Sequence, residues 1–244
     1  MLFYFWTSLS LDMQTHLITV LQRHFTEFHP VVPVGPGIRF IRFDFTRHNN
    51  WLPADVLTNT AVFSELVDHQ LGSEKATYGI GGYAEHRTLY DRSAVFNADR
   101  PGDEPRRLHL GTDIWGAAGT PVFAPCDGIV HSFADNDRFG DYGATIILSH
   151  MIEGKGFYTL YGHLTRASLK GLTTGKKIAK GEPFSAFGIA DENGHWPPHL
   201  HFQLIDDMLD YHGDYPGVCR FSEKEYWLNL CPDPEWILQL ERYL

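Results

Sequence analysis

Residues 195–205 read HWPPHLHFQLI and place two histidines, His199 and His201, two positions apart. Side chains two apart in a β-strand point to the same face of a sheet, so these imidazoles are predicted to lie side by side. Leu200 and Phe202 then face the opposite, apolar side. The two prolines before the pair favour an extended backbone, which supports a strand that begins here. The stretch therefore predicts a β-sheet with two imidazoles on one face.

The β pattern extends over residues 109–205. Short apolar runs such as ATIILSH and GFYTLYGHL alternate with glycine-containing turns, which is typical of an antiparallel sheet. Before this region, residues 14–29 and 54–72 carry apolar side chains at helical spacing, and residues 38–45 alternate as a strand does. The polar stretch at 97–107 separates the two regions and is the predicted boundary.

We therefore expect a mainly β protein, α+β overall, in three parts. Residues 1–104 are predicted to form an N-terminal helical and mixed extension, residues 105–210 an antiparallel β domain, and residues 211–244 a C-terminal tail that packs on the core. The chain has 244 residues, of which 43% are hydrophobic, and this content is sufficient for a large core.

The net charge of −10 argues against nucleic acid and anionic lipid as partners, because both repel an acidic surface. No transmembrane span is predicted. The first residues, MLFYFWTSLSLDM, are apolar, but they are too short to cross a bilayer and contain no Lys or Arg. Two interpretations stay open: a degenerate signal peptide, or a start upstream of the true one, with Met13 nearer the beginning.

The three cysteines, Cys126, Cys219 and Cys231, do not form a CxxC pair, which argues against a cysteine-based zinc site. Cys219 and Cys231 are compatible either with a disulfide or with two buried free thiols, and the sequence does not separate these states.

Candidate metal ligands occur in three places in the β region. His109 and Asp113 lie four apart, His163 ends a strand, and His199 and His201 form the pair above. In an extended segment the even spacing of the first two keeps both side chains on one face. Catalytic zinc uses three protein ligands, commonly imidazole and carboxylate, and leaves one position for water. Two histidines and one aspartate fit that pattern, and two further histidines remain for proton transfer.

The order of these motifs resembles the LytM/lysostaphin-type zinc metallopeptidases, the M23 peptidase family. The chain has HLGTD at 109–113, YGHL at 161–164 and HLHF at 199–202. The resemblance covers about residues 105–205. It implies an antiparallel β-sheet metallopeptidase core that binds Zn2+.

By the same resemblance, His109, Asp113 and His201 are expected to be the zinc ligands. His199 is expected to be the catalytic histidine close to the reactive water, and His163 its partner at the scissile carbonyl. The implied reaction is hydrolysis of peptide bonds in peptidoglycan cross-links or stem peptides, with peptidoglycan as the partner.

Two features depart from the family pattern. The segment DENGHWPP replaces the usual Gly/Ser-Thr-Gly loop before the histidine pair, so the wall of the substrate groove is expected to differ. In GGYAEHR, at 81–87, Glu85 and His86 suggest an N-terminal plug that reaches the metal. The alternative is that both side chains are merely solvated.

Two other functions are considered. One is an intracellular metallohydrolase that acts on small peptides or amides, and the other is a non-catalytic LytM-like regulatory module. The presence of all five expected positions favours the zinc endopeptidase. The resemblance points to the periplasm or cell envelope, whereas the lack of a clear signal peptide points to the cytoplasm.

Overall fold

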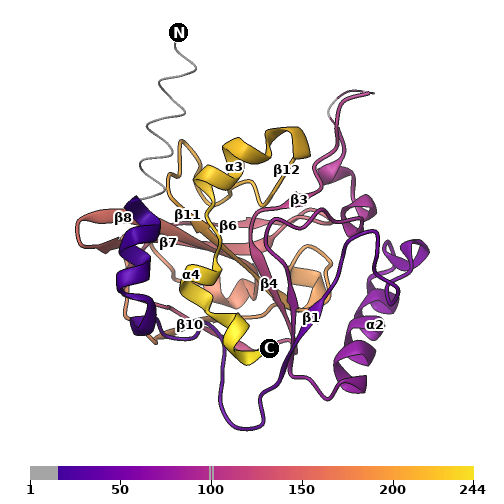
Figure 1. Ribbon diagram of the computed structural model, residues 1–244, viewed down its shortest axis with the longest axis horizontal. Helices are drawn as coiled ribbons and strands as arrows, with labels where there is room; N and C mark the ends of the chain where they lie inside the picture. The colour runs from indigo at the N-terminus through magenta and orange to yellow at the C-terminus, as the bar shows by residue number, and fades with distance from the viewer. Residues whose placement is uncertain (1–15, 99, 101) are drawn as a thin grey trace.

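The computed structural model describes residues 16–98, 100 and 102–244. The prediction for the first thirteen residues therefore lies outside the described part. The chain builds a main sheet of eight strands (Figure 1). Along the sheet these are β1 (Phe40–Phe43), β2 (Tyr78–Gly81), β4 (Thr112–Trp115), β11 (His199–Ile205), β8 (Lys155–Leu164), β7 (Gly143–Ile152), β6 (Gly128–Asn136) and β9 (Lys177–Ile178).

Two small sheets flank the main one. One pairs β5 (Pro121–Phe123) with β10 (Pro183–Ala186), and the other pairs β3 (Leu108–His109) with β12 (Val218–Cys219). The labelled α-helices are α2 (Thr60–Ser73), α3 (Lys224–Leu230) and α4 (Glu235–Leu238), and residues 16–23 are also helical.

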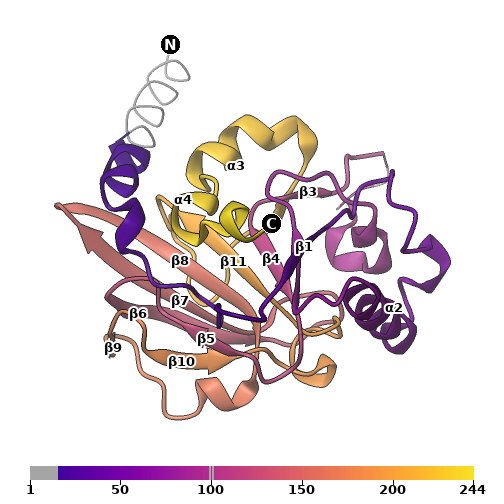
Figure 2. The same ribbon diagram turned by 60° about the horizontal axis from the view of Figure 1, so that its bottom comes forward.

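The predicted mainly β, antiparallel architecture is confirmed, with one exception at the edge of the sheet. Strand β11 lies between β4 and β8 and runs antiparallel to both (Figure 2). Strands β1 and β2 are parallel to each other. Helix α2 connects them, because parallel neighbours need a crossover long enough to bring the chain back to the same end of the sheet.

The main sheet continues across the predicted boundary at 97–107. Strand β2 pairs with β4 in the register Gly79 to Trp115, Ile80 to Ile114 and Gly81 to Asp113. The N-terminal region thus contributes two strands to the sheet that carries Asp113. The division into three parts stays a prediction, but the sheet itself does not stop there.

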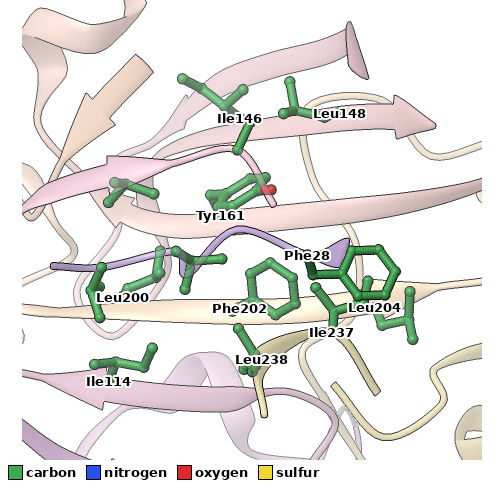
Figure 3. Close-up of a cluster of buried hydrophobic side chains, with 14 of the residues drawn as sticks. Phe28, Ile114, Ile146, Leu148, Tyr161, Leu200, Phe202, Leu204, Ile237 and Leu238 are labelled. Atoms are coloured by element: carbon green, nitrogen blue, oxygen red, sulfur yellow. The ribbon is translucent and has the colours of Figure 1, made fainter. Parts of the chain in front are cut away.

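The side chains on the apolar face of the sheet are those that the alternation in HLHF predicted. Leu200 and Phe202 are fully buried in one cluster with Ile114 of β4 and Tyr161 of β8 (Figure 3). Leu238 of the tail packs into the same cluster. Full burial of one such side chain stabilises the fold by about 1.5–3 kcal/mol, so this face anchors β11 and directs its two histidines the other way.

The helices are shorter than their apolar patterns suggested. Regular helix ends at residue 23 and gives way to a 3-10 turn at Phe25–Glu27. Helix α2 begins at Thr60 rather than at 54, because the Asn59 side chain accepts a hydrogen bond from the Val62 N–H and caps the helix there.

The three cysteines, Cys126, Cys219 and Cys231, are all free thiols in this structure, and the last two are buried in one apolar cluster.

Within the described ranges, no helix combines the length and apolar character needed to cross a membrane.

His150 generates a prediction about stability and pH. Its ring is buried, with Nδ1 2.9 Å from the Asp127 carbonyl oxygen and Nε2 2.7 Å from Thr159 Oγ1. Burial lowers the pKa of His150 to about 4, against 6.5 for the free group. The folded state therefore favours the neutral ring. The contribution of His150 to the free energy of unfolding is fully present above pH 6.5 and is lost as the pH falls toward 4.

We expect the His150→Gln variant of the metal-free protein to lose less stability than the wild type between pH 7 and pH 4. Between pH 7 and pH 4, the free energy of unfolding of the wild type should fall by about 3 kcal/mol more than that of the variant. Urea denaturation at several pH values measures it. Parallel curves for the two proteins would contradict the assignment.

Candidate metal centre

Three ligand atoms from three strands converge on one point. His109 Nε2 lies 2.9 Å from His201 Nδ1 and 3.2 Å from Asp113 Oδ1. His201 Nδ1 lies 3.1 Å from the same Asp113 oxygen. A tetrahedral site with zinc bonds of about 2.0–2.1 Å has edges of about 3.3 Å, so the three atoms are spaced as one zinc-sized ion requires. They form the potential metal-binding group found among the described residues.

The register between β4 and β11 brings two of the three ligand residues together. His201 lies opposite Asp113, and His199 lies opposite Trp115. Cross-strand neighbours on one face of an antiparallel pair have Cβ atoms about 4.5–5.5 Å apart. The apolar partners on the other face, Leu200 opposite Ile114, hold this register from behind.

His109 reaches the site by a bend, which corrects the expectation of one extended segment. In a straight strand, residues four apart are separated by about 13 Å and cannot share one ion. Strand β3 ends at His109, the chain turns at Leu110 and Gly111, and β4 begins at Thr112 in a different sheet. The two residues selected by the spacing do lie close together, but it is the bend and not an extended segment that brings them together.

In each histidine ligand, the outer ring N–H donates a hydrogen bond to an oxygen acceptor. His109 Nδ1 lies 3.0 Å from the Gly82 carbonyl oxygen, and His201 Nε2 lies 3.0 Å from Gln203 Oε1. These acceptors assign the proton to the outer nitrogen and leave the inner one with a free lone pair. Both rings are therefore oriented to coordinate a cation.

Asp113 divides its two oxygens between different partners. Oδ1 faces the two histidines, whereas Oδ2 accepts a 2.5 Å hydrogen bond from Arg87 Nη1. Burial alone would raise the pKa of Asp113, but His109 and Arg87 outweigh it and hold that pKa well below its usual range. The carboxylate is therefore ionised, as a metal ligand must be.

A second pair of imidazoles lies beside the three ligand atoms. The ring centroids of His163 and His199 are 4.0 Å apart. His199 Nδ1 donates to the Pro197 carbonyl at 2.8 Å, and His163 Nδ1 donates to the Asn193 carbonyl at 2.7 Å. Both Nε2 atoms therefore keep a free lone pair. Burial lowers the pKa of His199 to about 4 and holds the pKa of His163 well below its usual range, so both rings are neutral.

Two local features fix this pair. Trp115 stacks on His199 with centroids 3.9 Å apart and ring planes within 11°. His163 has φ of 62°, which is rare for a residue with a side chain. Regular alternation would turn His163 to the core side with Tyr161, and the left-handed backbone turns it to the face of the metal centre instead.

The four polar residues Asp113, His163, His199 and His201 line a cavity of about 230 Å3. Its walls come from parts of the chain on both sides of the β region. Tyr90 and Phe96 contribute from the N-terminal side, and residues 214–218 from the tail. All three predicted parts of the chain thus contribute to the cleft beside these imidazoles.

Glu85 and His86 do not act as the plug that the sequence suggested. The Glu85 carboxylate accepts hydrogen bonds from Arg87 Nε at 2.7 Å and from the Phe45 N–H at 3.2 Å. His86 is exposed, and its ring faces Phe221. Neither belongs to the three-ligand group. The parts of this segment that contact the proposed ligands are the Arg87 side chain and the Gly82 carbonyl.

Comparison with known proteins now identifies the β region. The model of peptidase family M23 matches residues 107–211. This domain belongs to peptidase family M23. The M23 domain contains His109, Asp113, His163, His199 and His201.

Two curated relatives and one solved structure show the extent of the similarity. The L-Ala--D-Glu endopeptidase of Bacillus subtilis is 32% identical over 148 residues, which are 57% of this chain and 43% of the relative. The peptidoglycan DD-endopeptidase ShyC of Vibrio cholerae is 26% identical over 166 residues, 64% of this chain and 35% of the relative. The catalytic domain of lysostaphin from Staphylococcus simulans is 22% identical, with a TM-score of 0.36, over 55% of this chain and 80% of that domain.

The chain therefore spans less than half the length of these curated relatives. The match supports the family of the M23 domain. The activity of the whole protein does not follow from this match and depends on the residues of the cleft.

Gly111 generates a prediction, because its backbone lies against a ligand. A Cβ atom there would lie 2.6 Å from His201 Cε1 and 2.7 Å from the Phe202 carbonyl oxygen. We expect Gly111→Ala to displace the His201 ring and to weaken zinc binding by about 10-fold or more. Competition with a chromophoric chelator measures this change.

Gly72→Ala is the matched control, since a Cβ atom at Gly72 would meet nothing within 4 Å. It should bind zinc as the wild type does. Equal zinc affinities for the Gly111 variant and this control would show that the position of the His201 ring does not depend on the absence of a side chain at residue 111.

Proposed function

We propose that this protein is a zinc-dependent endopeptidase that hydrolyses peptide bonds in peptidoglycan stem peptides or cross-links. One observation carries the proposal: three ligand atoms 2.9–3.2 Å apart share a cleft with two neutral imidazoles whose Nε2 atoms are free. That combination suits hydrolysis by an activated water. The names of the Bacillus and Vibrio relatives support peptidoglycan peptides as the substrate class.

The residues fit zinc better than magnesium or calcium, because two of the three ligand atoms are imidazole nitrogens. When bound by His109, Asp113 and His201, zinc supplies Lewis-acid polarisation of the scissile carbonyl and of a water molecule. The remaining steps fall to side chains of the cleft.

His199 is the proposed general base. Its Nε2 accepts the proton of the attacking water and passes it to the leaving amine. Stacking on Trp115 holds the ring plane, so the lone pair keeps one direction throughout.

His163 is the proposed partner at the substrate carbonyl. Its Nδ1 proton is already donated to Asn193, so its Nε2 donates only when the ring carries a second proton. We propose that this second proton comes from solvent as the oxyanion develops and returns to solvent when the product leaves, and that the charged ring stabilises the oxyanion in between.

We further propose that the protein acts in the cell envelope, where peptidoglycan is found. The two other functions are less well supported. A non-catalytic module does not need two oriented imidazoles beside a complete ligand set. An intracellular hydrolase of small amides would use the same chemistry, so only the choice of substrate distinguishes it from the proposed endopeptidase.

Digestion of purified sacculi tests the proposal. We expect one zinc per chain, release of muropeptides, and loss of release after treatment with a chelator that zinc then reverses. Synthetic stem peptides and cross-linked dimers identify the bond. Bound zinc with no cleavage of sacculi, but with cleavage of small unrelated amides, would overturn the substrate class, and absence of bound zinc would overturn the mechanism.

Substitutions should separate metal binding from turnover. Asp113→Ala should weaken zinc binding by more than about 100-fold, beyond the loss typical of outer-shell changes. His163→Ala and His199→Ala should keep the zinc and lose about 100-fold or more in kcat, the usual contribution of acid–base groups. Zinc analysis and release of muropeptides measure the two quantities.

His86→Ala serves as the control, because this histidine is exposed and lies outside the cleft lining. It should keep both zinc and rate. Full activity of His163→Ala would show that its assigned role is wrong.

A further inference from the structure

Arg87 is a buried guanidinium in the segment between β2 and the 3-10 helix η3 (Leu89–Arg92). Its side chain is 1% exposed, and it lies outside the matched residues 107–211. A charge so deeply buried is rare unless it is paired. Its presence therefore needs a partner of opposite sign and a full set of acceptors.

The guanidinium has four partners around the metal centre. Nη1 donates to Asp113 Oδ2 at 2.5 Å and lies 3.3 Å from the Tyr90 hydroxyl. Nε donates to Glu85 Oε2 at 2.7 Å, and Nη2 donates to the Gly82 carbonyl at 3.2 Å. The planar fork of arginine suits this arrangement, because its donors point in fixed directions.

Two of these acceptors belong to the metal centre. Asp113 provides a ligand atom, and the Gly82 carbonyl also accepts the Nδ1 proton of His109. One side chain thus holds the carboxylate of one ligand and the acceptor that orients another. Removal of Arg87 would release both at once.

The main chain strengthens the same connection. The Ala84 N–H donates to the His109 carbonyl at 3.0 Å, and the His109 N–H donates to the Glu85 carbonyl at 3.0 Å. Residues 82–87 therefore clamp the His109 backbone and, through Arg87, the Asp113 side chain.

We propose that Arg87 is a positioning residue of the metal centre, which occupies Asp113 Oδ2 so that Oδ1 alone faces the ion. The inference rests on the zinc site of the proposed function. It assigns the N-terminal region a part in metal binding, in place of a removable plug. A positive charge near a cation opposes binding by Coulomb repulsion, whereas the orientation of two ligands favours it, and the inference holds that orientation dominates.

Zinc affinity, measured by chelator competition on the full chain, tests this inference. We expect Arg87→Met to bind zinc about 10–100-fold more weakly, the loss typical when an outer-shell partner of a ligand is removed. Arg87→Lys should recover only part of that loss, since an ammonium keeps the charge but not the fork. The zinc-induced rise in Tm should fall in the same order.

Arg107→Met is the matched control. Arg107 is also buried, pairs with Asp91, and does not line the cleft. It should keep wild-type zinc affinity even if its Tm without metal falls. This comparison separates loss of a buried ion pair from loss of ligand orientation.

Glu85→Gln covers the case in which the Arg87 variants do not fold, because it weakens the Arg87 Nε contact and preserves side-chain volume. A several-fold loss of zinc affinity supports the inference. Zinc affinity equal to or tighter than wild type in a folded Arg87→Met, or unchanged affinity in Glu85→Gln, overturns it. A wild type that binds no zinc would instead refute the proposed function.

Discussion

The structure depends on the register of β11 against β4. Antiparallel pairing places His201 opposite Asp113, and Leu200 opposite Ile114 on the reverse face. A slip of one residue would exchange the two faces, bury the imidazoles in the apolar cluster and expose the leucine. The apolar packing behind the sheet and the polar chemistry in front of it are therefore set by the same hydrogen-bonded ladder.

The residues that orient the metal ligands are not confined to the matched M23 residues 107–211. Gly82 and Arg87 precede the domain and contact His109 and Asp113. Strand β2 also pairs with β4, so the N-terminal region supports Asp113 from its side of the sheet. On the other side, the Gln203 amide that orients His201 donates to Cys231 Sγ and to the Pro216 carbonyl of the tail. The segments outside the matched residues thus help to orient the ligands.

Local patterns in the sequence predicted the parts of the site that lie within one strand. The alternation of HLHF predicted the common face of His199 and His201 and the buried face of their neighbours, and both are confirmed. Trp115 and Gln203 were missed, although each lies two positions from a candidate ligand on the same face. The alternation that selected the histidine pair would have found them.

Other features were outside the reach of periodicity. Arg87 lies 26 positions from Asp113, and nothing in its neighbourhood predicts that contact. The bend at Gly111 and the left-handed backbone of His163 are single-residue departures from regular strands, and alternation rules assume regular strands. The parallel pairing of β1 with β2 is likewise a long-range choice, which the helix between them permits but does not specify.

The most direct measurement of the central claim is the position of the metal in crystals grown with zinc, located by anomalous scattering at the zinc edge. The account predicts one site at about 2.0–2.2 Å from His109 Nε2, Asp113 Oδ1 and His201 Nδ1, with Asp113 Oδ2 still bound to Arg87. A zinc ion held by other residues, or no zinc between these three side chains, would contradict it.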